Sequence, residues 1–592
     1  MSIHSPHPDD SRASDVSSSD TLTEVPTSAT TKSVAYWKVV ASHSLVTPEV
    51  LHYHYDGSGT IEDPYNVEFI PRDHRNPLGF SMFKKWTITV LIAFTTLAVS
   101  FASSAYSGGL AEIMQEFRCS EEVAILGVSI FVLGFAIGPL LWAPLSEMYG
   151  RQLLFFGTYG AFAAFSAGAA GSQNVTTLIV LRFFAGAFGS SPLTNAGGVI
   201  ADMFPARQRG LAISIFAAAP FMGPTLGPIV GGFVGESVGW RWIQGVIAIF
   251  TGALWILGTF TIPETYAPVL LRKRAAALSE QTGQVYRSGL EIARGPPPTI
   301  AESFKVALSR PWILLFSEPI VLLLSIYMAI IYGTLYMCFG AFPIVYAETR
   351  HWSQGISGLA FLGVAVGMIS AVIYTIPDNN RYLRAEDSAI AKGERAAPPE
   401  ARLPPGMIGS ICIPIGLIIF AWTNYPSIHW SVSIIFTAPF GFGMVLVFLS
   451  IFNYLIDAYT IYAASVLAAN SVLRSAFGAI FPLFTTYMYH GLGIHWASTI
   501  PAFLALACVP FPFLFYKFGP RIRLKCKYSR EADEAMQNLA RVERVKPQSG
   551  WASESDGRER DEIEVKEPRQ RKDMEREDGR RSEDRDVEKG EM

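Results

Sequence analysis

The stretch APFMGPTLGPIVGG, residues 219–232, places glycine and proline together inside a strongly apolar segment. Both residue types recur every four positions, and a last glycine follows: Gly223, Gly227, Gly231, Pro220, Pro224, Pro228 and Gly232. On a helix, this spacing gives a glycine stripe beside a proline stripe. Small residues let a second membrane helix approach closely, whereas each proline removes a backbone hydrogen bond and bends the helix. The stretch predicts a bent membrane helix pressed against a neighbour where two bundles move. Close packing in a static bundle is the alternative.

The composition of the chain points to a membrane protein. Half of the 592 residues are apolar and only 16% are charged, against about 25% in an average soluble protein. Polar and charged residues gather in 1–85 and 518–592. The region between them repeats apolar segments of about 20 residues, the length that crosses a bilayer. The sequence therefore predicts an all-α polytopic membrane protein.

Twelve such segments follow one another in two groups of six. They lie near residues 87–107, 123–143, 153–171, 177–199, 210–233, 243–262, 318–339, 355–376, 407–423, 431–455, 460–488 and 497–517. With this count, the Lys and Arg residues of the connections fall on one side, for example Lys84 and Lys85 before the first segment and Arg272 after the sixth. Positive charge marks the cytoplasmic side, so both termini are expected in the cytoplasm.

The count divides the chain into five parts. We expect a largely disordered cytoplasmic tail (1–85), an N-terminal six-helix half (86–262), a central cytoplasmic loop (263–316), a C-terminal six-helix half (317–517) and a charged cytoplasmic C-terminal tail (518–592). The last part has almost no apolar residues after position 551, so it cannot bury a core. A helical, solvated tail is the alternative for that part.

Six motifs resemble those of the major facilitator superfamily, and three of them narrow the resemblance to its fungal drug:proton antiporter-1 branch with twelve spans. The general motifs are GPTLGPIVGG (223–232), GPLLWAPLSEMYGRQ (138–152) and LRFFAGAFGSSPLTNAGG (181–198). The narrower ones are DPYNVEF (63–69), PETYAPVLLRKR (263–274) and FNYLIDAYTIYAASVLAANSVLRSAFGAIFPLF (452–484). The resemblance covers about residues 60 to 530. It implies the major facilitator fold, a helix-5 antiporter motif, proton coupling and transport by rocking of two halves.

The motif between the second and third segments departs from the pattern of that family. Glu147 stands where aspartate is usual, and Met148 and Gln152 replace basic residues, whereas Arg151 is kept. Glu147 ends the second helix, where it could meet the positive N-terminus of the eleventh helix near 460 and hold one conformational state. A surface carboxylate with no gating role is the alternative.

Two arginines, Arg182 and Arg474, are placed at membrane depth by the sequence. A charge there is costly, so each is a candidate for coupling or gating, as are Arg151 and Asp457 near the ends of their helices. Bonding to the backbone carbonyls of bent helices is the alternative role of the two arginines. Asp457 lies too near the cytoplasmic end of its helix to reach Arg474.

Aromatic and amide side chains suggest a substrate cavity between the halves. The candidates are Tyr106, Asn195, Tyr332, Tyr336, Asn453, Asn470 and Phe481. Aromatic rings give broad apolar contact and hydroxyl groups orient a ligand, which suits bulky hydrophobic solutes. Many of these rings could equally face lipid or the core. The middle of the apolar segments carries no carboxylate, which disfavours a polycation such as a polyamine and leaves no clear proton carrier.

These observations predict a transporter that exports hydrophobic small molecules from a fungal cell by proton antiport. The alternatives are an uptake carrier for a nutrient or polyamine, and a receptor on the same scaffold. An enzyme is disfavoured because the chain has no HExxH motif, histidine cluster or nucleotide loop, and its five cysteines lack metal-binding spacing. We expect no cofactor, no metal and no nucleic-acid partner. The expected state is a monomer in the plasma membrane, with the vacuolar membrane as the alternative.

Overall fold

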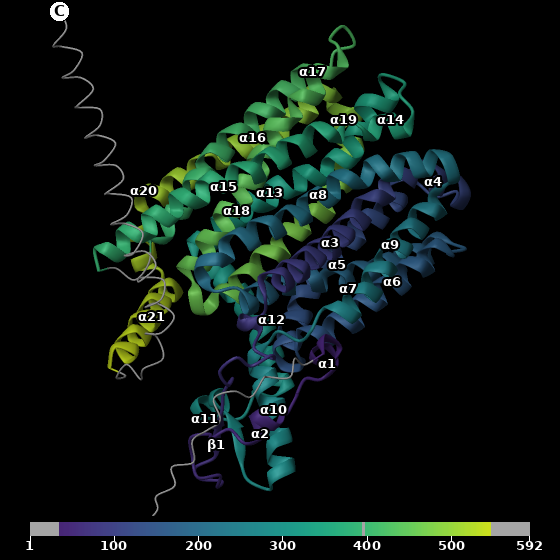
Figure 1. Cartoon of the computed structure of the whole chain (residues 1–592). Coiled ribbons are helices and arrows are strands. Elements are labelled where there is room, and N and C mark those ends of the chain that lie inside the picture. Colours follow the sequence, from purple (N-terminus) through teal and green to yellow (C-terminus); the bar gives the residue numbers. More distant parts are fainter. Residues whose placement is uncertain (1–34, 394–396, 546–592) are drawn as a thin grey trace, which may run out of the picture.

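The computed structural model describes residues 35–393 and 397–545 and shows a bundle of long helices that run side by side (Figure 1). We use first half and second half for the parts of the chain before and after residues 263–316. The long helices of the first half are α3 (Met82–Ala105), α5 (Glu121–Tyr149), α6 (Arg151–Ala170), α7 (Val175–Met203), α8 (Ala206–Val238) and α9 (Trp240–Thr261). Those of the second half are α13 (Pro319–Phe342), α15 (Phe361–Ala391), α16 (Pro404–Trp422), α18 (Thr437–Ala458), α19 (Ala463–Cys508) and α20 (Pro510–Lys525).

Ten candidate membrane spans meet the criteria of length and hydropathy within the described residues. One of them, 460–525, includes Gly493, whose backbone is non-helical (φ 76°, ψ 161°), so α19 consists of two helices joined at that residue. Helix α8 is not among the ten, although it packs inside the bundle. The all-α membrane architecture agrees with the sequence analysis, and the count of twelve spans stays a prediction.

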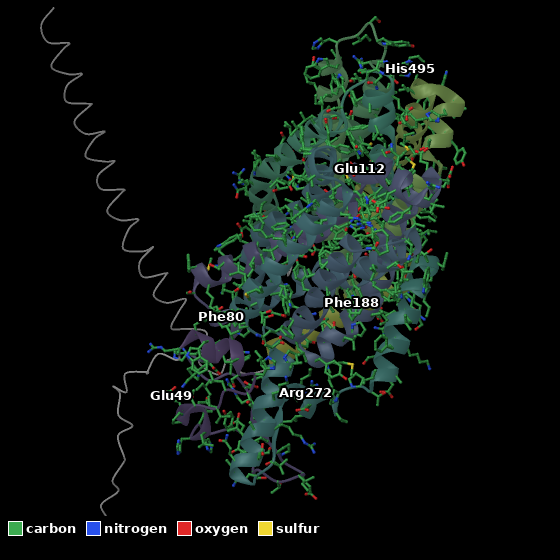
Figure 2. All side chains as sticks on the ribbon, turned by 90° about the vertical axis from the view of Figure 1, so that its right-hand side faces the viewer. Glu49, Phe80, Glu112, Phe188, Arg272 and His495 are labelled. Atoms are coloured by element: carbon green, nitrogen blue, oxygen red, sulfur yellow. The ribbon has the colours of Figure 1, made fainter. Side chains whose placement is uncertain are left out.

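The bundle has two distinct ends. One, called here the inner end, carries α1 (Tyr36–Ala41), α2 (Pro48–Leu51), α10 (Ala267–Thr282), α11 (Gly289–Arg294), α12 (Ile300–Ser317) and α21 (Lys527–Val545). The other, called the outer end, carries α4 (Leu110–Phe117), α14 (Gln354–Gly358) and α17 (Trp430–Ile435). Figure 2 shows Glu49 and Arg272 toward the inner end, and Glu112 and His495 toward the outer end.

A small module at the inner end joins the N-terminal segment to the segment between the halves. Strand β1 (Tyr65–Val67) pairs in parallel with β2 (Tyr286–Ser288), and Tyr65 lies opposite Tyr286. Asp73 forms a buried ion pair with Arg274 of α10, and the guanidinium of Arg75 donates a hydrogen bond to the carbonyl oxygen of Glu264 (3.0 Å).

This module corrects the expectation of a largely disordered tail over 1–85. Residues 35–85 are ordered because residues 263–288, which are remote in sequence, supply their partners. No hydrophobic periodicity reveals such short elements in advance. Residues 1–34 lie outside the described part. In the C-terminal tail, residues 518–545 belong to α20 and α21, and residues 546–592 lie outside the described part.

Candidate functional site

Helix α8 packs along its glycine stripe against α3, which belongs to the same half. A Cβ atom added at Gly223 would lie 2.6 Å from the backbone nitrogen of Phe101, and one at Gly227 would lie 2.7 Å from that of Ala105. One at Gly231 would lie 2.2 Å from the carbonyl oxygen of Ala105. These distances leave no room for a side chain, so the glycines permit backbone contact between α8 and α3.

A different face of α8 meets the second half. A Cβ atom on Gly358 of α14 would lie 2.5 Å from the carbonyl oxygen of Pro228, and one on Gly232 would lie 2.9 Å from the carbonyl oxygen of Gln354. Between Gly358 and Pro228 there is thus also no room for a side chain. The glycine stripe itself faces α3 within the first half, and the contact between halves uses Pro228 and Gly232 beside it.

Hydrogen bonds extend this contact at the outer end. A carboxylate oxygen of Glu236 accepts hydrogen bonds from Ser353 Oγ (3.0 Å) and the backbone N–H of Gly355 (2.9 Å). The side-chain amide of Gln354 donates a hydrogen bond to the carbonyl oxygen of Gly108 (2.6 Å). We call these contacts, together with those of Pro228, Gly232 and Gly358, the outer seam.

A second contact between the halves joins α5 to α19 at the same end. Thr486 Oγ1 donates a hydrogen bond to Glu121 (2.8 Å), and the hydroxyl group of Tyr487 donates a short one to Glu122. Both carboxylates lie in the first turn of α5. Two pairs of helices therefore connect the halves at the outer end, α8 with α14 and α5 with α19.

Arg182 of α7 is 1% exposed and lies among backbone carbonyl groups. Its Nε donates a hydrogen bond to the carbonyl oxygen of Gly127 (2.6 Å), and its Nη atoms donate to Ala102 and Ser103 (3.3 Å each). The guanidinium carbon lies 4.3 Å from the ring centroid of Tyr106. Carbonyl oxygens and an aromatic face thus compensate the buried charge. This is the carbonyl-bonding arrangement that the sequence left as an alternative.

A chain of hydroxyl groups crosses from the first half to the second beside Arg182. Ser103 Oγ donates to the carbonyl oxygen of Ser100 (2.6 Å), so the hydroxyl group of Tyr336 must donate to Ser103 Oγ (2.7 Å). The hydroxyl group of Tyr332 donates to that of Tyr336 (3.2 Å). The guanidinium of Arg474 lies 4.8 Å from the ring centroid of Tyr332. We call this arrangement the central chain.

The central chain unites three residues that the sequence nominated, Tyr332, Tyr336 and Arg474. Arg182 and Tyr106, also nominated, lie beside it. Ser103 was missed, because a serine in a long apolar helix carries no signal that distinguishes it from a neighbour that bonds its own backbone. Phe221 of α8 and Phe448 of α18 add a further contact across the halves, with ring centroids 4.7 Å apart.

Other nominated cavity residues lie elsewhere. The Phe481 ring packs against Gly333, and the amide of Asn470 donates hydrogen bonds to Ser325 Oγ (3.2 Å) and Met328 Sδ (3.1 Å). Both sit where α19 packs against α13, inside the second half. Asn453 is half-buried on α18. Asn195 lies near the inner end of α7, in a polar group around Arg151.

Arg151 lies at the centre of that polar group. Its Nη1 donates hydrogen bonds to Ser146 Oγ (2.5 Å) and Asn195 Oδ1 (3.3 Å), and its Nε lies 3.6 Å from the carboxylate of Asp202. A cavity of about 20 Å³, lined partly by Arg151 and Asn195, leaves space for one water molecule. The group joins α5, α6 and α7 of the first half.

Glu147 is exposed at the end of α5, outside this polar group. Burial and, after it, the charge of Glu147 raise the pKa of Tyr266 above its usual value. Among the described residues, none near position 460 donates a hydrogen bond to Glu147. Asp457 forms an ion pair with Arg402 (2.9 Å) within the second half, away from Arg474.

Glu264 is a buried residue whose role the sequence did not reveal, although it belongs to the motif PETYAPVLLRKR. Its carboxylate accepts hydrogen bonds from the backbone N–H groups of Arg151 (3.0 Å) and Gln152 (3.1 Å), the first two residues of α6. It also accepts from those of Thr265 and Tyr266. A carboxylate at a helix N-terminus satisfies free N–H groups and the helix dipole. Glu264 therefore fixes the start of α6 to the end of α9.

Comparisons with known proteins agree with this geometry. A family model described as "Major Facilitator Superfamily" matches residues 92–482. "Major facilitator superfamily multidrug transporter mdrA" of Aspergillus fumigatus is 63% identical over 515 residues, 87% of this chain and 84% of that protein. "MFS-type efflux pump MFS2" of Trichophyton rubrum is 64% identical over 506 residues, 86% of this chain and 84% of that protein.

A solved structure shares the fold at low sequence identity. The proton:xylose symporter XylE, bound to 6-bromo-6-deoxy-D-glucose, has a TM-score of 0.53 and is 16% identical; the match covers 74% of this chain and 96% of that one. The bundle of long helices, the family model and relatives more than 60% identical over most of their length lead to one conclusion. This chain belongs to the major facilitator superfamily of membrane transporters.

Proposed function

We propose that this protein exports hydrophobic small molecules from a fungal cell by alternating access. The contact between the halves, at the outer seam and the central chain, is the observation that carries the proposal. The names of its relatives, a multidrug transporter and an efflux pump, support the direction of transport. Drugs, toxins and metabolites made by the cell itself all belong to the proposed substrate class.

In the proposed cycle, the closed outer end must open to release substrate. Helix α8 moves together with α3, because the glycine stripe holds these two helices at backbone contact. The parts that separate are the weaker contacts of the outer seam, a few hydrogen bonds and the Gly358–Pro228 approach. Rocking of two halves about a central site is the usual form of alternating access in such folds.

The central chain supports a hydrophobic substrate. Its tyrosines offer aromatic surface and hydroxyl groups that orient a ligand. The charge of Arg182 already has carbonyl partners and an aromatic face, so it does not demand an anionic substrate. Opening the outer seam would separate Ser103 from Tyr336 and free both hydroxyl groups for other partners.

We further propose that the inner end faces the cytoplasm, that the protein is a monomer in the plasma membrane, and that proton entry drives export. Lys and Arg residues of the inner connections support the orientation. The division of the chain into two six-helix halves joined by residues 263–316 is part of the same proposal.

An accumulation assay tests the direction and the coupling. Cells with and without the gene receive a lipophilic fluorescent dye, and retention is measured at acidic and neutral external pH. We expect lower retention in cells with the gene, with a larger difference at acidic pH. Higher retention with the gene would indicate an uptake carrier. Retention that is equal in both strains for a panel of hydrophobic compounds would contradict the proposal and favour a receptor.

A further inference from the structure

An exposed aromatic and basic surface lies at the inner end of the first half. Trp37 of α1, Phe83 of α3 and Phe260 of α9 are 66%, 84% and 74% exposed. Two lysines accompany them, Lys38 next to Trp37 and Lys84 next to Phe83. We call these five residues the inner aromatic patch.

Helix α1 carries Trp37 and Lys38 of this patch, and contacts on its other face hold the helix in place. Val39 and Val40 are buried, and the carbonyl oxygen of Val40 accepts a hydrogen bond from the side-chain amide of Gln152 (3.0 Å). The hydroxyl group of Tyr36 donates a hydrogen bond to the carbonyl oxygen of Thr261, the last residue of α9. Helix α1 therefore lies at the level where α9 ends, and its exposed face has a defined direction.

The patch continues the lipid-facing surface of the membrane helices. Ile249, Ile256 and Phe260 lie on one face of α9 at helical spacing and are 65%, 55% and 74% exposed. Phe83 is the second residue of α3, a candidate span. Because Tyr36 contacts the end of α9, Trp37 lies where this exposed apolar surface of α9 ends.

The chemistry of the patch fits a membrane surface. Tryptophan and tyrosine are enriched where the bilayer meets water, and basic side chains there are attracted to anionic headgroups. The ammonium group of Lys84 lies 4.5 Å from the ring centroid of Tyr36 and 3.4 Å from that of Phe80, and that of Lys38 lies 5.6 Å from that of Trp37. Lys38 is exposed, whereas Lys84 is half-buried against the rings of Tyr36 and Phe80. Aromatic rings and cations thus occur together at the inner end.

We propose that the inner aromatic patch binds anionic phospholipids of the bilayer leaflet at the inner end. The occupant is the headgroup layer itself, because the patch is continuous with the lipid-facing side of α3 and α9 and carries two cations. In this arrangement, the segment before the first membrane helix lies on the membrane surface. Contact of α1 with the membrane would also hold the start of α6 in place, because the side-chain amide of Gln152 donates a hydrogen bond to the carbonyl oxygen of Val40. This inference does not depend on the direction of transport.

Spin labels in the full-length chain measure the depth of this segment. One nitroxide is placed at Ala35→Cys, beside the patch, and a matched one at Glu49→Cys, an exposed position on α2 away from the bundle (Figure 2). Cys119 and Cys412, the incompletely buried native cysteines, are replaced by serine. In phospholipid nanodiscs, we expect oxygen to relax the Ala35 label more than a water-soluble nickel chelate does, and the reverse for the Glu49 label.

The same label tests the preference for anionic lipid. In nanodiscs that contain phosphatidylserine, the Ala35 label should become less mobile than in phosphatidylcholine alone. The double variant Lys38→Glu/Lys84→Glu should abolish this difference, whereas Lys38→Arg/Lys84→Arg should keep it. Equal accessibility of the Ala35 and Glu49 labels to the nickel chelate would overturn the proposal. So would mobility of the Ala35 label that is the same in both lipids, because it would show that the patch does not prefer anionic headgroups.

Discussion

Replacement of Gly358 by alanine should weaken the outer seam selectively. The new Cβ atom would lie 2.5 Å from the carbonyl oxygen of Pro228, against 3.4 Å where ordinary contact begins, so the two helices must separate there by about 0.9 Å. Such overpacking costs about 1 to 3 kcal/mol. The cost applies only while the seam is closed, so the ratio of closed to open protein should fall about 5- to 150-fold.

Labelling of a buried cysteine measures this shift. Ser357 is 4% exposed and adjoins Gly358, so Ser357→Cys should react with a membrane-impermeant maleimide only when the seam opens. We expect Gly358→Ala to raise the labelling rate in that background and to lower net export. Two controls separate this effect from general damage.

The first control is Gly197→Ala, whose new Cβ has no atom within 4 Å apart from its own stretch of helix. It should change neither the labelling rate nor export. The second, Gly227→Ala, places a Cβ 2.7 Å from the backbone nitrogen of Ala105 in the same half. It should lower thermal stability without faster labelling. A labelling rate and export in Gly358→Ala equal to those of the parent protein would refute the assignment of this contact to the moving seam.

Three further predictions concern single side chains. Tyr336→Phe removes the donor to Ser103 and leaves Tyr332 without its acceptor, so the closed state should lose about 1 to 3 kcal/mol. The cysteine of the Ser357→Cys background should then label faster. An unchanged labelling rate would count against the central chain. Glu264→Ala leaves the first N–H groups of α6 without an acceptor and should cost about 1 to 3 kcal/mol of stability. The midpoint of thermal unfolding in detergent should fall, and it should fall less for Glu264→Gln. Equal midpoints for the two variants would contradict the capping role. Asp73→Ala leaves Arg274 buried and unpaired, at a cost of about 3 to 5 kcal/mol. Limited proteolysis should therefore cleave within residues 35–75 before it cleaves the bundle. Unchanged cleavage would show that the module does not depend on this ion pair.

The sequence revealed the membrane architecture because apolar length and proline–glycine spacing are local properties of the chain. It could not tell which neighbour each face of α8 meets, since periodicity defines a face and not its partner. For Arg182, burial was expected from its position, but the choice between transport chemistry and carbonyl bonding depended on Gly127 and Ala102, which are remote in sequence. Pairing of the N-terminal segment with residues 263–288 was equally hidden, because short strands and isolated ion pairs leave no repeating pattern.

A reversible cross-link across the outer seam tests whether the halves must separate there during transport. Glu236 Oε2 and Ser353 Oγ lie 3.0 Å apart on opposite halves, so Glu236→Cys and Ser353→Cys can be joined by a short methanethiosulfonate linker. Dye export by the doubly substituted protein is measured in one preparation before cross-linking, after it, and after reduction, with each single cysteine variant as a control. We expect export to stop in the cross-linked protein and to return on reduction. Export that continues at the original rate while the linker is in place would contradict this expectation.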